Sequence, residues 1–409
     1  MLLLAGLVTL TERPASAAFL GQWYSAPPLT EARFHATSVL MGDGRVLVSG
    51  GRVGDALRTT AEVLSPFTMH WTPTGSMGTP RWQHTATALP NGKVLVTGGF
   101  TNPFTLGANA QPVSDTAELY DPATATWTAT GPMTTRRALH VAQLLDNGKV
   151  LVAGGRTCDQ PPPTACNFTF RTNTAELYDP ATGAFTPTGS MQFDRHTTAA
   201  VKLLDGRVLV PAGFTNVGNG PNGDIYDPAT GTWSQTLNLV ESRARQGGAL
   251  LPGGRVLVMA GFPNRTTSET YDPGTNQWTL SGNVVAAGRF NFSFTTLPDG
   301  RVLMAGGQVP GTGISKTAEL WASGAWTPLP DMANPHGNSS SLGNSEKAIV
   351  LSGNPDTYVT DSSKCGNRCG AVLVIGNHAA GAVDLFVPSC TASSPTTRAA
   401  CLGPVPVTP

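Results

Sequence analysis

The sequence predicts an all-β protein assembled from repeated four-stranded antiparallel units. Gly (47) and Pro (33) make up nearly a fifth of the 409 residues, which favours many short strands joined by tight turns. One hairpin pattern recurs six times with the same internal spacing. No long window shows the apolar period of about 3.6 residues that indicates an amphipathic helix.

Each repeat begins with an arginine and a β-hairpin. Eleven residues after the arginine stands the glycine of an Asn-Gly, Asp-Gly or Gly-Gly turn, which between two apolar runs is a strong hairpin signal. The second strand reads Val-Leu-Val or close to it, which indicates burial on both faces. The opening arginines are Arg33, Arg81, Arg137, Arg195, Arg243 and Arg289.

Two more strands follow each hairpin. The hairpin ends in a small-residue pair such as Gly98-Gly99, because strands that converge on an axis need close backbone approach and positive φ. A third strand reads Thr-Ala-Glu-Leu-Tyr-Asp-Pro, as at 116–122 and 174–180, and its Asp-Pro marks a turn. An aromatic residue then marks a fourth strand, and the series is Trp71, Trp127, Phe185, Trp233, Trp278 and Trp326.

Four strands per unit, a diglycine and a late tryptophan resemble the kelch repeat over residues 22–358. The resemblance implies that each unit is one blade of a β-propeller. A seventh, eroded copy of the second strand is predicted at 347–353. Only six aromatic fourth strands lie downstream of these copies, and Trp23 precedes Arg33 by ten residues. We therefore expect the strand at 22–28 to complete the last blade and close the ring.

The predicted fold is thus a seven-bladed kelch β-propeller of four-stranded antiparallel blades, closed by an N-terminal strand. Six blades plus a degenerate cap is the alternative, because the last copy lacks the opening arginine and the diglycine. Strand-like stretches at 372–375 and 382–387 could supply the outer strands of the last blade.

The N-terminus resembles a secretory signal peptide. An apolar run at 2–10 precedes Ala15-Ser16-Ala17, a small-residue cleavage signal, so cleavage is expected after Ala17. The run is about half the length needed to span a bilayer, and no transmembrane segment is expected. The predicted domains are the signal peptide (1–17), the propeller (18–360) and a C-terminal extension (361–409). The expected location is secreted, periplasmic or at the cell surface.

Export makes disulfides the expected state of the six cysteines. They are Cys158, Cys166, Cys365, Cys369, Cys390 and Cys401. The first two flank a Pro-rich insertion and are predicted to pair with each other. The four in the tail could pair in chain order, Cys365 with Cys369 and Cys390 with Cys401, or in a crossed arrangement. A zinc site is the second choice, because no histidine accompanies Cys365-x-x-x-Cys369 at a finger spacing.

Charge gives little sign of an electrostatic partner. Basic and acidic residues number 26 each and total 13% of the chain, which disfavours nucleic acid as a ligand. The repeated arginines match repeated third-strand acids, and we interpret them as ion pairs within or between blades, since an active site needs asymmetry. The acids are Glu62, Glu118, Glu176, Asp224, Glu269 and Glu319.

Function is expected where the repeats differ. Two such segments are the residue after the diglycine and the pair after the opening arginine. The resemblance to peptide-binding kelch proteins implies that both line one mouth of the central channel. The predicted ligand-binding residues are Arg52, Trp82, Phe100, Arg156, His196, Arg245, Phe262, Phe290, Asn291 and His336. Arginine beside aromatic rings suits a carboxylate-bearing peptide or a sugar. Long insertions at 100–115 and 156–173 would form a rim on the same face.

We interpret the chain as a non-enzymatic, monomeric binding module for an extracellular protein or glycan, with no cofactor or metal. A kelch-type sugar mutarotase or epimerase is the first alternative, in which His196 and His336 could transfer protons. A copper-radical oxidase resembling galactose oxidase is the second. That family needs two Tyr, two His and a cross-linked Cys, whereas four of the six Tyr here belong to the repeated strand and no Tyr-His pair occurs.

Overall fold

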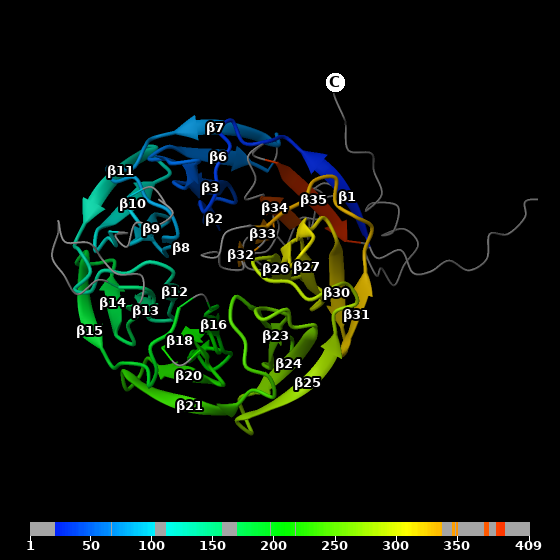
Figure 1. The fold of residues 1–409 in the computed structure, drawn as a ribbon. Helices are drawn as coiled ribbons and strands as arrows, with labels where there is room; N and C mark the ends of the chain where they lie inside the picture. The colour runs from blue at the N-terminus through cyan, green and yellow to red at the C-terminus, as the bar shows by residue number, and fades with distance from the viewer. Residues whose placement is uncertain are drawn as a thin grey trace, which may run out of the picture.

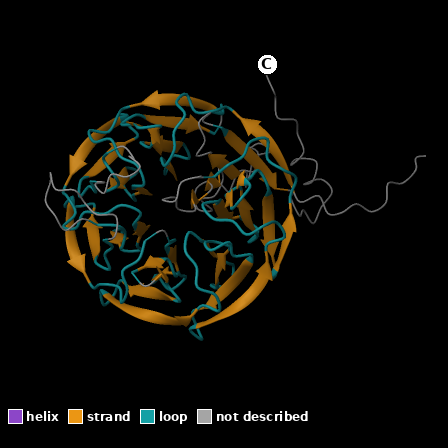
Figure 2. Ribbon diagram, in the orientation of Figure 1, coloured by secondary structure: helices purple, strands orange, loops and turns teal. Residues whose placement is uncertain are grey.

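The computed structural model describes residues 21–337 apart from 67, 103–111, 158–169, 197 and 217, together with 346–347, 349–350, 372–375 and 382–388. These residues form strands and turns (Figure 2). None of them belongs to a helix long and apolar enough to cross a membrane. The predicted signal peptide and all six cysteines lie outside the described residues, so cleavage and disulfide pairing stay predictions.

Within these residues the strands form seven antiparallel blades arranged in a ring (Figure 1). The strands of each blade are given from the channel outwards. Blade 1 is β2 (Thr37–Leu40), β3 (Val46–Ser49), β6 (Ala61–Ser65) and β7 (His70–Thr74), and blade 2 is β8 (Thr85–Ala88), β9 (Val94–Thr97), β10 (Ala117–Asp121) and β11 (Thr126–Thr130). Blade 3 is β12 (Val141–Leu144), β13 (Val150–Ala153), β14 (Ala175–Asp179) and β15 (Ala184–Thr188). Blades 4 and 5 are β16 (Val201–Lys202), β17 (Val208–Val210), β20 (Asn222–Asp227) and β21 (Thr232–Asn238); and β22 (Gly247–Leu250), β23 (Val256–Met259), β24 (Thr267–Asp272) and β25 (Gln277–Asn283).

Blade 6 is β26 (Ser293–Thr296), β27 (Val302–Ala305), β30 (Ala318–Ala322) and β31 (Ala325–Pro328), and β32 (Glu346–Lys347) pairs with β26 in parallel. Blade 7 is β33 (Ile349–Val350), β34 (Val372–Ile375), β35 (Val383–Pro388) and β1 (Gly21–Ala26). Three small hairpins lie between second and third strands: β4 (Arg52–Val53) with β5 (Ala56–Leu57), β18 (Phe214–Thr215) with β19 (Gly218–Asn219), and β28 (Gln308–Val309) with β29 (Gly313–Ile314).

The N-terminal strand closes the ring, as the repeat count predicts. Strand β1 pairs antiparallel with β35, from Gly21 opposite Pro388 to Ala26 opposite Val383. Figure 1 shows this junction as a blue strand beside a red one. The ring of seven blades is therefore confirmed, and the six-bladed alternative is excluded.

The inner part of blade 7 differs from the prediction. The segment expected at 347–353 to be a second strand supplies instead the innermost strand β33, which pairs with β34. Strand β34 takes the second position because Val372, Leu373 and Val374 are fully buried, which suits a strand covered on both faces. Strands β34 and β35 also lie beyond residue 360, in the stretch assigned above to a C-terminal extension.

A buried ion pair lies within each of the first six blades. In blade 3, Arg137 Nη2 lies 2.7 Å from Glu176 Oε1. Arg137 also donates to the carbonyl oxygen of Gly154, and Glu176 accepts the backbone N–H groups of Thr134 and Thr135. The corresponding pairs are Arg33–Glu62, Arg81–Glu118, Arg195–Asp224, Arg243–Glu269 and Arg289–Glu319. The repeated charges are thus used inside the blades.

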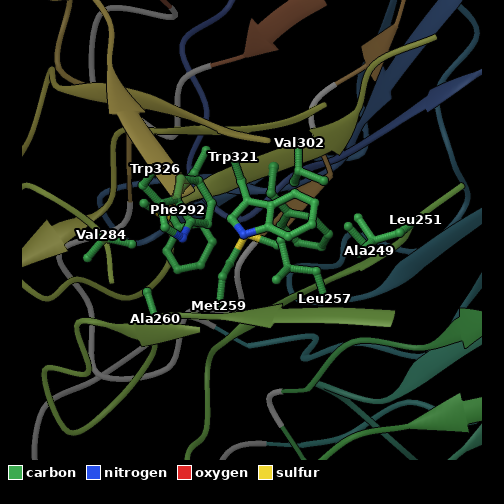
Figure 3. Packing of buried hydrophobic residues seen from close by; sticks show 12 residues of the cluster. Ala249, Leu251, Leu257, Met259, Ala260, Val284, Phe292, Val302, Trp321 and Trp326 are labelled. Atoms are coloured by element: carbon green, nitrogen blue, oxygen red, sulfur yellow. The ribbon is translucent and has the colours of Figure 1, made fainter. Parts of the chain in front are cut away.

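Neighbouring blades meet through the diglycines and through apolar side chains. Gly99 N donates to Arg137 O at 2.9 Å, and a Cβ on Gly98 would lie 2.2 Å from the same oxygen. Only glycine allows this approach at the observed φ of +63°. Between blades 5 and 6, Met259 packs in one buried cluster with Trp321 (Figure 3).

Candidate functional site

The two segments in which the repeats differ are paired with each other in every one of the first six blades. Trp82 N donates to Phe100 O at 3.1 Å, and Phe100 N donates to Trp82 O at 2.8 Å. The six bridges are Phe34–Arg52, Trp82–Phe100, Ala138–Arg156, His196–Phe214, Ala244–Phe262 and Phe290–Gln308. These residues define what we call the loop face, at the end of the channel where the innermost strands begin.

The next residue in each described repeat has a left-handed backbone although it is not glycine. The φ angles are 58° at His35, 53° at Gln83, 56° at Leu139, 53° at Arg245 and 56° at Asn291. Backbone hydrogen bonds from Gln83 N to His35 O and from Leu139 N to Gln83 O join adjacent blades. Backbone of this kind costs roughly 1–3 kcal/mol per residue, and its recurrence at these five positions makes it a property of the repeat.

Arg245 lies against three phenylalanine rings from three consecutive blades. Its guanidinium carbon is 5.1 Å from the centroid of Phe214, 5.6 Å from that of Phe262 and 5.2 Å from that of Phe290. The rings also contact one another, at 5.5 Å and 5.8 Å between centroids. Burial lowers the pKa of Arg245 to about 10, so the side chain is still a cation at neutral pH.

Two further arginines lie with Arg245 around His196. Arg156 forms a backbone bridge with Arg171. Burial, followed by the charges of Arg171 and Arg245, lowers the pKa of Arg156 to about 10. Burial and then these three arginines hold the pKa of His196 well below its usual range. We call Arg156, Arg171 and Arg245 the cationic cluster.

Blades 1 and 2 form a different, closely packed part of the loop face. The Trp82 ring lies 4.6 Å from Phe100 and 5.1 Å from His35, and the Arg52 guanidinium is 5.1 Å from its centroid. Trp82 and Phe100 are fully buried. Gln83 Nε2 lies 2.5 Å from His35 Nδ1. These predicted ligand-binding rings are therefore used in packing, while Arg52 is half-buried above them.

The remaining predicted residues fall into two groups. Phe262 is half-buried and Asn291 and Phe290 are buried, all at the loop face. His336 lies inside blade 7, with its Nε2 2.6 Å from Asp384 Oδ2. The carbonyl oxygen of His336 accepts a hydrogen bond from Gly307 N. The carbonyl oxygens of opening arginines accept the same bond from the second glycine of the preceding blade, as Arg137 O does from Gly99 N. His336 therefore takes the place of the missing seventh opening arginine. The prediction had placed it one position later in the repeat, at the mouth of the channel.

Arg171 and Phe214 were not among the predicted residues. Phe214 carries a usable signal, because it follows a small-residue pair just as Phe100 and Phe262 do. Arg171 stands at the far end of the second long insertion. The other repeats have no residue at an equivalent position, so the repeat pattern does not predict where its side chain lies. Its bridge to Arg156 can be seen only once the chain has folded back.

A cavity of about 280 Å³ lies along the innermost strands of the same side of the ring. Its lining includes Gln143 of blade 3, Lys202 of blade 4, Leu250 of blade 5, and Thr295 and Thr296 of blade 6. The cationic cluster and the cavity thus both belong to blades 3 to 6.

Comparison with known proteins gives a consistent picture. The family model for the Kelch motif matches residues 81–134. Kelch-like protein 26 of Danio rerio is 26% identical over 195 residues, which cover 48% of this chain and 29% of that protein. F-box/kelch-repeat protein At1g30090 of Arabidopsis thaliana is 35% identical over 100 residues, covering 24% and 23%. The chain spans less than a third of the length of these curated relatives.

Two solved structures share the fold. That of YjhT covers 74% of this chain and 99% of its own, at 18% identity and a TM-score of 0.57. That of a fungal alcohol oxidase of the AA5 family, in complex with copper, covers 90% and 77%, at 15% identity and a TM-score of 0.66. Seven four-stranded blades in a closed ring define a β-propeller. The chain is therefore a seven-bladed β-propeller that carries a Kelch motif at residues 81–134.

The described residues contain no group of three or more His, Cys, Asp or Glu side chains placed to hold a metal ion. They therefore offer no set of ligands for a copper ion like that of the oxidase. The repeated tyrosines serve the blades instead. Tyr120, Tyr178 and Tyr226 are buried, and their hydroxyls lie 2.7–3.0 Å from a threonine hydroxyl of the preceding blade. No step through copper follows from these residues.

Proposed function

We propose that this protein is a non-enzymatic binding module that holds an extracellular protein or glycan at its loop face. The observation that supports this most is the asymmetry of that face. Arg245 with its three phenylalanine rings, and the rest of the cationic cluster, belong to blades 3 to 6, whereas the aromatic rings of blades 1 and 2 are buried in packing. Repeated structure alone gives no reason for such a difference between blades.

Binding accounts for the site better than proton transfer does. A general acid or base works best with a pKa near the operating pH. Burial and the neighbouring arginines hold the pKa of His196 well below that range. His336, the second candidate for a mutarotase, lies inside blade 7 beside Asp384. The loop face therefore presents fixed charge and apolar surface, which suit recognition.

A binding screen with matched variants tests the proposal. Residues 18–409 would be applied to glycan and peptide arrays as the wild type, as Arg245→Ala, and as Arg255→Ala. Arg255 is an exposed residue of a hairpin turn and serves as the control. We expect hits that Arg245→Ala weakens by about tenfold or more, because charge-assisted contacts contribute about 1.5–3 kcal/mol, and that the control retains. Hits that both variants retain equally would refute the assignment of the site.

We further propose that residues 1–17 direct export and that the mature protein is a monomer. The apolar run at 2–10 and the small residues at 15–17 support the first part. Terminal sequencing of protein recovered outside the cytoplasm should give Ala18 as the first residue. Sedimentation should give a mass near that of one chain, and a dimer mass would contradict the second part.

A further inference from the structure

Resting on the proposed binding at the loop face, we infer that the ligand carries a carboxylate and that Arg156, Arg171 and Arg245 bind this carboxylate. The inference specifies the chemistry of the ligand. It also makes the cationic cluster, rather than the aromatic residues of blades 1 and 2, the part of the face that selects it.

The fold does not need these arginines where they stand. Each opening arginine is accounted for by a third-strand carboxylate in its own blade. The residues at the position of Arg156 in other blades are Arg52, Phe100, Phe214, Phe262 and Gln308. Those at the position of Arg245 are His35, Gln83, Leu139 and Asn291. Blades with other side chains at these two positions adopt the same bridges and the same backbone, so neither feature requires the charge of Arg156 or Arg245.

The cluster concentrates positive charge in a partly desolvated place. Arg156 and Arg171 form a backbone bridge, and Arg245 lies against the ring of Phe214, two residues before the asparagine that Arg171 binds. Charges of one sign that lie together away from bulk water repel each other more strongly than they would on an open surface. Arg171 Nη1 donates to Asn216 Oδ1 at 2.9 Å, and Asn216 N donates to Asp194 Oδ1 at 3.4 Å. A carboxylate bound here would meet positive charge from more than one arginine.

A carboxylate fits the cluster better than an inorganic anion. Guanidinium groups bind carboxylates through two parallel N–H···O contacts, and their planar faces stack on aromatic rings. Phe214 and Phe262 are only half-buried, so apolar surface remains beside the charge. An organic acid can place its carboxylate on the arginines and its carbon skeleton on these rings, which phosphate or sulfate cannot do.

Matched pairs of small probes test the charge directly. Glucuronate is compared with glucose, and N-acetylglutamate with N-acetylglutamine, by calorimetric titration of residues 18–409. We expect the charged member of at least one pair to bind about tenfold or more tightly than its neutral partner. Its affinity should fall as sodium chloride is raised, since salt screens the attraction. The pair that responds tells an acidic sugar from an acidic side chain, and inorganic phosphate that binds as tightly as either acid would overturn the choice of a carboxylate.

Two double variants locate the binding site. Arg156→Gln with Arg171→Gln removes two positive charges from the cluster. Arg207→Gln with Arg255→Gln removes two from hairpin turns, where the arginines pair with Asp205 and Asp272. We expect about a tenfold or greater loss of carboxylate affinity in the first variant and less than about a twofold change in the second. A thermal unfolding midpoint close to that of the wild type shows that each variant is folded.

The outcomes separate this inference from the proposed function. Neutral and charged probes that bind equally, with binding lost in Phe262→Ala, would keep the loop face as a binding site and overturn the carboxylate. Carboxylate binding that survives in Arg156→Gln with Arg171→Gln would overturn the role of the cluster. No binding of any probe, together with array hits that do not depend on Arg245, would refute both.

Discussion

At the scale of single residues, the arginines of this protein have two different roles. Some pair with a buried carboxylate inside a blade, and others lie beside aromatic rings at the loop face. Burial lowers the pKa of Arg137, while its hydrogen bond to Glu176 opposes that shift. Burial also lowers the pKa of Arg245, which lies under three aromatic rings. The first kind fixes the geometry of a blade, and the second leaves a cation close to the loop face.

The ion pair of blade 3 shows what the first kind contributes. We expect Arg137→Met to lower the free energy of unfolding by about 3–5 kcal/mol, because it leaves the carboxylate of Glu176 buried without its cation. Adding Glu176→Gln should recover part of this loss, because it removes the buried negative charge while its one amide oxygen can still accept one of the two N–H groups of Thr134 and Thr135. Urea denaturation measures both variants.

Lys149→Met is the matched control, because Lys149 forms an exposed pair with Asp179. It should cost less than about 1 kcal/mol. If Arg137→Met cost no more than this control, the buried pairs would contribute nothing beyond an exposed one.

The sequence carries this residue-scale information unevenly. The ion pairs were predictable because the same charges return in every repeat. The cationic cluster was predictable in part, since Arg156 and Arg245 stand at the positions where the repeats differ, whereas Arg171 comes from an insertion with no counterpart in the other blades. Trp82 and Phe100 pack against each other across a bridge, and nothing in their spacing indicates which aromatic ring remains exposed to a ligand.

At the scale of elements, blade 7 is the one blade assembled from both ends of the chain. Strand β1 completes it by pairing with β35 over six residues. The Trp23 ring lies 4.9 Å from Phe386 at this junction. Here His336 and Asp384 stand where the other blades have arginine and a third-strand acid. The closing blade therefore depends on strand pairing more than its neighbours do.

Removing β1 tests this dependence. A chain that begins at residue 27 should unfold at a lower temperature than one that begins at residue 21, because β35 loses its partner and the ring loses its closure. The exposed edge of β35 is then free to pair with another molecule. Calorimetry measures the first effect and size-exclusion chromatography the second. Equal midpoints and a single monomer peak for both chains would show that β1 contributes little.

The repeat pattern predicts most elements and misplaces one. Hairpin turns and apolar second strands recur in six blades, so their strands follow from spacing. In blade 7 the opening arginine and the diglycine are gone, and the alignment assigned the segment at 347–353 to the second position. The order of the strands in blade 7 follows burial instead, because Val372, Leu373 and Val374 of β34 are fully buried in the second position.

At the scale of the whole molecule, buried histidines link the blades to one another. The ring nitrogen His84 Nε2 lies 3.0 Å from Thr37 Oγ1 of blade 1, and His140 Nε2 lies 3.0 Å from Thr85 Oγ1 of blade 2. Blade 5 has a glutamine at the repeat position of these histidines, and Gln246 Nε2 donates at 3.1 Å to Thr198 Oγ1 of blade 4, which lies one repeat position before that of Thr37 and Thr85. A hydrogen bond to the preceding blade can therefore be made from this position without a titratable group.

This arrangement predicts that the ring is sensitive to acid. Burial, followed by nearby arginines, holds the pKa of His84 and His140 well below the usual 6.5, and burial with Arg52 lowers that of His35 to about 3. Below about pH 6.5 the unfolded chain binds protons that the folded chain excludes. Stability is therefore present above that pH and lost as pH falls, by up to about 1.4 kcal/mol per pH unit for each such histidine.

His84→Gln with His140→Gln tests this link between blades and pH, because a glutamine at this repeat position can donate to a threonine of the preceding blade, as Gln246 does. Urea denaturation at pH 8 should give nearly the wild-type free energy of unfolding. Between pH 6.5 and about 4.5, the variant should lose stability less steeply than the wild type, since two buried groups no longer need to stay neutral. Equal slopes for the two proteins would mean that these histidines are not the source of the acid sensitivity.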